Sequence, residues 1–101
     1  MNTLVKQTHS QQRAAERYCI SDFKPYLALK EILDDNCVQI DESIDKYSRK
    51  FLIKYLNKYI IVVTDFQVNY VKTCLPFKEK FYSFLDELIS KINNKNLEVV
   101  K

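Results

Sequence analysis

Residues that could carry out catalysis are few in this chain and lie far apart. The single histidine, His9, lies in a polar segment, and no neighbouring residue would orient its ring as a general base requires. The serines have no histidine at a suitable spacing, and pairs such as Asp34–Asp35 are sequence neighbours, for which solvated charge is the usual state. We therefore predict that the protein is not an enzyme and needs no cofactor.

The cysteines indicate neither a metal site nor a disulfide framework. Cys19, Cys37 and Cys74 are odd in number and widely separated, and no CxxC pair is present. We expect buried thiols in a reducing compartment. Of the three, Cys74, which follows Lys72, has the most suitable surroundings for a reactive thiol, although burial is the expected state there too.

Composition restricts the fold and excludes several classes of protein. The 101 residues suffice for one domain, predicted to span 1–101 with frayed ends at 1–7 and 95–101. The absence of glycine excludes phosphate-binding glycine-rich loops, leaves positive φ angles to Asn or Asp, and makes tight hairpins difficult to build. A net charge of +3 is too small for a nucleic-acid-binding tail. The longest apolar run, YIIVV, is too short to cross a membrane, so we expect a soluble intracellular protein of the cytoplasm or nucleus.

The segment from Asp41 to Tyr70 has the spacing of a long helix. Its aromatic residues recur every three or four positions, and four lysines recur every four positions on the opposite side. If it is helical, the aromatic stripe forms a partner-binding face made of Tyr47, Phe51, Tyr55, Tyr59 and Phe66. The basic stripe forms an alternative nucleic-acid-binding face made of Lys46, Arg49, Lys50, Lys54 and Lys58.

A strand over 60–71 is the alternative for the second half of this segment. Its β-branched residues favour a strand, but a stable sheet needs about three strands. Only CVQI and LEVV are available as neighbours, and no turn residue separates Tyr59 from Ile60. We therefore predict one helix to about Tyr70.

Shorter elements flank this segment. Thr8 begins a capping box, and Pro25 begins a helix over 25–33, followed by an extended VQI. Pro76 opens a last helix, which NNKN ends. Its apolar face comprises Phe77, Phe81, Phe84, Leu85, Leu88 and Ile92. The predicted fold class is all-α, a small helical bundle with one long central helix.

This order of elements resembles the histone fold. Asp41 caps the predicted long helix, a Lys72–Thr73 pair follows it, and the resemblance covers about 24–88. The arginine–aspartate clamp of that family is missing. The resemblance implies a chain that pairs through its long helix and serves in nuclear, DNA-associated complexes.

The predicted function is a non-enzymatic protein-interaction module or complex subunit that pairs through the long helix, with a protein partner or as a homodimer. One alternative is a weak nucleic-acid-binding subunit that uses the basic stripe. Another is a small helical inhibitor, chaperone or immunity-type protein that blocks its partner. No metal, membrane or small-molecule substrate is expected.

Overall fold

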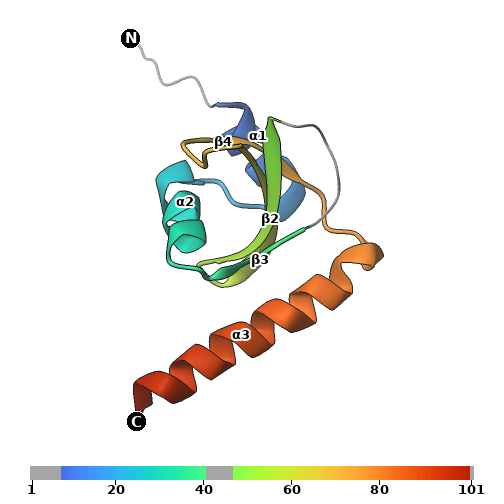
Figure 1. Ribbon diagram of the computed structural model, residues 1–101. Coiled ribbons are helices and arrows are strands. Elements are labelled where there is room, and N and C mark those ends of the chain that lie inside the picture. The colour runs from blue at the N-terminus through green and yellow to red at the C-terminus, as the bar shows by residue number, and fades with distance from the viewer. Residues whose placement is uncertain (1–7, 41–46, 101) are drawn as a thin grey trace.

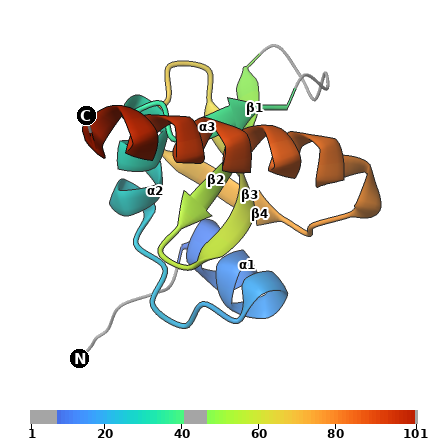
Figure 2. The same ribbon diagram turned by 90° about the horizontal axis from the view of Figure 1, so that it is seen from below.

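A computed structural model describes residues 8–40 and 47–100, with side chains to residue 95. A four-stranded antiparallel sheet of order β1-β2-β3-β4 lies between two helices on one face and a third on the other (Figures 1 and 2). The elements in chain order are α1 (His9–Tyr18), α2 (Pro25–Leu33), β1 (Cys37–Gln39), β2 (Ser48–Tyr55), β3 (Lys58–Asp65), β4 (Val71–Leu75), the 3-10 turn η1 (Glu79–Phe81) and α3 (Tyr82–Val100).

The prediction of an all-α bundle with a long central helix is wrong, and so is the resemblance to the histone fold. The segment read as one helix is the hairpin β2–β3, in which Tyr55 pairs with Lys58 across a two-residue turn. Its apolar runs, Phe51–Ile53 and Ile60–Val63, are buried by helices on both faces of the sheet. Such a strand shows no alternation of polar and apolar residues, so periodicity cannot distinguish it from a buried helix.

The tight turns form without glycine. In the described residues, four non-glycine residues adopt positive φ: Cys19 at 58°, Asp35 at 61°, Leu56 at 53° and Val68 at 59°. The expectation that Asn or Asp would take these positions holds only for Asp35. Leu56 makes the β2–β3 turn, which is how this chain builds a hairpin that its composition disfavours.

Each face of the sheet has its own apolar core. Phe51, Ile53 and Tyr55 of β2 face α1 and α2, where they join Phe23 and Ile32. The alternate residue Leu52 faces α3 and packs with Val38, Ile61, Phe81 and Leu88. Successive residues of a strand point to opposite faces, so β2 serves both cores at once.

Several local predictions are confirmed. The capping box at Thr8 is present, α2 spans 25–33 with Pro25 in its first turn, and the VQI segment contributes to β1. The apolar face predicted for the last helix packs against the second core.

Other local predictions fail or lie outside the described residues. The last helix begins at Tyr82 rather than Pro76 and continues through 93–96 to Val100. The cap at Asp41 and the frayed segment 1–7 lie outside the described residues, and fraying of 95–101 stays a prediction. In the part of the chain that the structure describes, no helix is long and apolar enough to cross a membrane.

Candidate functional site

The predicted partner-binding aromatic residues do not form one surface. Phe51 and Tyr55 are buried between the sheet and the helices α1 and α2, with 3% and 2% of their surface exposed. Tyr59 packs on the opposite face, beside α3. Only Tyr47 and Phe66 are exposed, and both lie at the end of the sheet where β2 begins and β3 ends.

The predicted basic stripe is also divided by the sheet. Lys50 and Lys54 lie on the same face as α3, and Lys50 is buried with 7% of its surface exposed. Arg49 and Lys58 belong to the opposite face, and Lys46 lies outside the described residues. These residues would form a continuous phosphate-binding face on a helix, but on a strand they cannot.

The two edges of the sheet differ in how they are covered. Helix α1 covers β4, where Arg17 Nη1 donates to Cys74 O at 2.7 Å and the Tyr18 hydroxyl donates to Leu75 O. At the other edge is β1, a strand of three residues that pairs with β2. Among the residues that the structure describes, no strand pairs with the outer side of β1, which is therefore the open edge of the described sheet.

The main chain of β1 presents hydrogen-bonding groups outward. Ile40 N donates to Lys50 O at 2.9 Å, so Ile40 faces β2. Alternate residues of an antiparallel strand face the same neighbour, and Val38 therefore also faces β2, whereas Cys37 and Gln39 face away. In agreement, Cys37 O accepts a hydrogen bond on its outer side, from Lys91 Nζ of α3 at 2.8 Å.

A cleft of about 560 Å³ runs beside this open edge. The wall on the α2 side carries apolar side chains together with Arg49, and the wall on the α3 side is charged. Val68, in the β3–β4 turn, extends the apolar wall toward the end of the sheet. The residues that make the two walls are Ile32, Leu33, Phe51 and Val68 on the α2 side and Glu87 and Lys91 on the α3 side.

Arg49 reaches into the cleft with a fixed guanidinium group. Its Nη2 donates to Gln39 Oε1 at 2.8 Å and its Nη1 to Phe66 O at 3.4 Å. The guanidinium carbon lies 5.0 Å from the centre of the Phe51 ring and 5.8 Å from that of Phe66. These hydrogen-bond partners are neutral oxygens, so the described side chains hold the cation in place without neutralising its charge.

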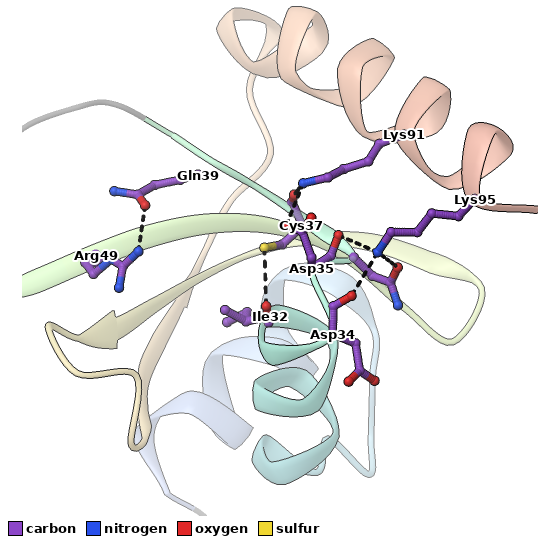
Figure 3. Close-up of polar contacts among 9 residues, drawn as sticks. Ile32, Asp34, Asp35, Cys37, Gln39, Arg49, Lys91 and Lys95 are labelled. Atoms are coloured by element: carbon purple, nitrogen blue, oxygen red, sulfur yellow. Dashed lines mark hydrogen bonds and ion pairs between the residues drawn. The ribbon is translucent and has the colours of Figure 1, made fainter. Parts of the chain in front are cut away.

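Two lysines of α3 hold the charged wall against the turn after α2 (Figure 3). Lys91 Nζ donates to Asp35 Oδ1 and to Cys37 O, each at 2.8 Å. Lys95 Nζ donates to Asp34 O, Asp35 O and Asn36 Oδ1, also at 2.8 Å each. The hydrogen bond from Lys91 lowers the pKa of the Asp35 carboxyl below its ordinary 3.8. These contacts fix the width of the cleft because they join α3 to the start of β1.

Cys37 supplies the thiol that lines the cleft. Burial raises the pKa of the Cys37 thiol, which donates to Ile32 O at 3.8 Å. A thiol with a raised pKa is a poor nucleophile at neutral pH. His9 lies elsewhere, at the start of α1, where it accepts from Arg13 Nε at 3.4 Å. Within 8–40 and 47–100, no three His, Cys, Asp or Glu residues are grouped so that they could hold a metal ion.

Comparison of the chain with protein-family models, curated proteins and solved structures gave no match. The cleft was missed at the level of sequence because its walls come from α2, the β3–β4 turn and α3. One signal was available: Leu56–Asn57 interrupts two apolar runs, and Asn is a common residue of two-residue turns.

Proposed function

We propose that this protein is a non-enzymatic interaction module that binds an extended segment of a partner protein along the open edge of β1. The observation that carries the proposal is the outward-facing main chain of Gln39 beside a walled cleft. Extended segments add to such edges through main-chain hydrogen bonds, and their alternating side chains contact the two walls.

Gln39 supplies the principal main-chain contacts in this proposal. The carbonyl of Cys37 already accepts from Lys91, whereas the N–H and the C=O of Gln39 both point away from β2. A bound strand therefore pairs with Gln39 through one donor and one acceptor. Because β1 has only three residues, the side-chain walls must supply much of the affinity.

Exposed aromatic residues extend this surface beyond the cleft. Phe66 contacts the guanidinium of Arg49, and Tyr47 precedes β2 at the same end of the sheet; they are 62% and 64% exposed. Tyr70, 54% exposed, lies at the end of the same β3–β4 turn. Aromatic and arginine side chains carry much of the energy of protein interfaces. In this proposal Tyr47 and Phe66 contact the partner from the end of a sheet rather than from a helix.

A protein partner suits this geometry better than nucleic acid does. Phosphate binding needs several cations on one surface, and the predicted cations lie on opposite faces of the sheet. Binding of this kind fits both a subunit that joins a complex and an inhibitor that blocks its partner.

Replacement of Gln39 by proline tests the proposal directly. Proline removes the N–H of residue 39, which points away from β2, so the hydrogen bonds between β1 and β2 are kept. The matched control is Gln39→Ala, which keeps the N–H and removes the side chain. The probe is a random peptide library displayed on phage and selected against the wild-type protein. Affinities of selected synthetic peptides are then measured by calorimetry, and the fold of each variant is checked by chemical denaturation.

We expect Gln39→Ala, which loses the side-chain contact with Arg49, to bind the selected peptides more weakly than the wild type. Gln39→Pro should bind them at least about tenfold more weakly than Gln39→Ala, since one main-chain hydrogen bond and the approach of the strand are also lost. Amide chemical shifts should change along 37–39 on binding. Strand addition at β1 would be refuted if Gln39→Pro bound the peptides as tightly as Gln39→Ala, or if the chemical-shift changes were confined to another surface.

A further inference from the structure

Among the described residues that line the cleft, Arg49 combines a fixed position with a charge that no described carboxylate neutralises. Its guanidinium is held by the oxygens of Gln39 and Phe66 and lies over the Phe51 ring (Figure 3 shows the contact with Gln39). Lys91, the other cation of the cleft, is paired with Asp35 at 2.8 Å. An incoming acidic group therefore gains more from Arg49 than from Lys91.

The register of the sheet places Arg49 on a definite side of the cleft. Gln39 pairs with Phe51, so the side chains of Cys37, Gln39, Arg49 and Phe51 all point to the α2 side. Toward the start of β1, this side is apolar: Cys37 contacts Ile32 through its thiol. Leu33, 73% exposed, lines the cleft from the end of α2. The α2 side thus presents a cation beside Gln39 and an apolar surface beside Cys37.

Alternate residues of an added strand face the same wall, about 6.6–6.8 Å apart. Two such residues, separated by one, would lie beside Gln39 and Cys37. The residue between them would face α3, where Glu87 and Lys91 line the cleft.

On this basis, and resting on the proposed function, we infer that the bound segment carries an acidic residue and an aliphatic residue separated by one position. The carboxylate pairs with the guanidinium of Arg49, and the aliphatic side chain packs on Ile32 and Leu33. Arginine suits this role because its planar fork matches a carboxylate and its contacts with the phenylalanine rings leave N–H groups at its edge. The occupant is a peptide segment of another protein.

The probe is a positional-scanning library of synthetic peptides in which Glu, Lys or Leu is fixed at each position in turn. It is applied to the wild type, Arg49→Gln and Arg49→Glu. The matched control is Arg13→Gln, which changes an arginine of α1 that pairs with Glu16 outside the cleft. The fold of each variant is verified by denaturation, and Arg49→Lys, which keeps the charge, covers the case in which Arg49→Gln does not fold.

We expect the wild type and Arg13→Gln to prefer peptides with Glu and Leu two positions apart, by about tenfold or more over Lys at the acidic position. Arg49→Gln should lose the preference for Glu and keep the preference for Leu. Arg49→Glu should prefer Lys, and Arg49→Lys should keep part of the preference for Glu.

Failure of this inference is distinguishable from failure of the proposed function. The inference alone would be overturned if peptide binding is weakened by Gln39→Pro but shows no preference for Glu. The same holds if the preference for Glu persists in Arg49→Gln. An absence of peptide binding would overturn both. A stable homodimer through β1 that peptides do not displace, or a single-stranded oligonucleotide that displaces acidic peptides, would replace the peptide as the occupant and overturn the inference.

Discussion

The hydroxyl of Tyr18 is inserted between two strands of the sheet, and its removal should destabilise the fold strongly. It accepts a hydrogen bond from Ile61 N of β3 at 3.1 Å and donates to Leu75 O of β4. Ile61 and Leu75 are paired residues in the register of β3 and β4, so the Tyr18 hydroxyl links the two strands at this pair. In Tyr18→Phe the chain keeps the ring and loses this bridge.

The magnitude follows from burial. Ile61 is fully buried, so its N–H would lose its partner out of reach of water, at a cost of about 1–3 kcal/mol, and the lost bond to Leu75 adds roughly 1 kcal/mol. We expect Tyr18→Phe to lower the free energy of unfolding by about 2–4 kcal/mol in urea denaturation. The control is Tyr26→Phe, which removes the hydroxyl of a tyrosine that is 64% exposed. An equally small effect of both substitutions, under about 0.5 kcal/mol, would refute the bridging role.

The same hydroxyl predicts a dependence of stability on alkaline pH. Burial raises the pKa of Tyr18 from its ordinary 10.0 to about 12. The unfolded chain therefore releases this proton first, and the folded state loses stability as pH rises from 10 through 12. Tyr18→Phe lacks this group, so its disadvantage relative to the wild type should narrow over that interval. The measurement is the free energy of unfolding of both proteins as a function of pH. If the difference between the wild type and Tyr18→Phe stays constant from the ordinary pKa of 10.0 up to about 12, the hydroxyl is not buried and protonated as described.

Two further predictions concern the turns and the thiols. Leu56→Gly should stabilise the protein by about 0.5–1 kcal/mol, because glycine adopts a positive φ angle without the steric cost that leucine incurs, and the Leu56 side chain is exposed. Asn57 does not have a positive φ angle, so Asn57→Gly should not stabilise the protein. Stabilisation by Asn57→Gly alone would contradict this account of the turn. A thiol reagent at pH 8 should label one cysteine per folded chain, the exposed Cys19, and all three cysteines in denaturant. In the folded chain, burial raises the pKa of Cys37 and raises that of Cys74 to about 12. Rapid labelling of a second thiol in the folded protein would contradict the burial.

Elements governed by local chemistry were predictable from the sequence. The capping box at Thr8 and the proline that opens α2 act within one helical turn. The amphipathic face of α3 was also predictable because the helix is covered on one side only, so its apolar residues keep their helical spacing.

The central hairpin was not predictable in the same way, because its residues are buried on both faces. Phe51, Leu52 and Ile53 are successive residues that serve two different cores, so the alternation that marks a strand is absent. Aromatic residues spaced by four in β2 and β3 imitated a helical stripe. The turn between the strands lacks glycine, and Leu56 takes a conformation that its residue type disfavours.

The sequence by itself determined the features that depend on one helical turn or on one side of an element. These are the starts of α1 and α2, the extended VQI and the apolar face of the last helix. The tertiary structure alone decided that the β1 edge is open among the described residues and that a cleft lies beside it. Arg49 meets Gln39 only because β1 pairs with β2, and Lys91 meets Cys37 only because α3 packs across the sheet. The physical reason is that these contacts join residues from separate elements, whose position depends on the burial of both sheet faces rather than on any local preference of the chain.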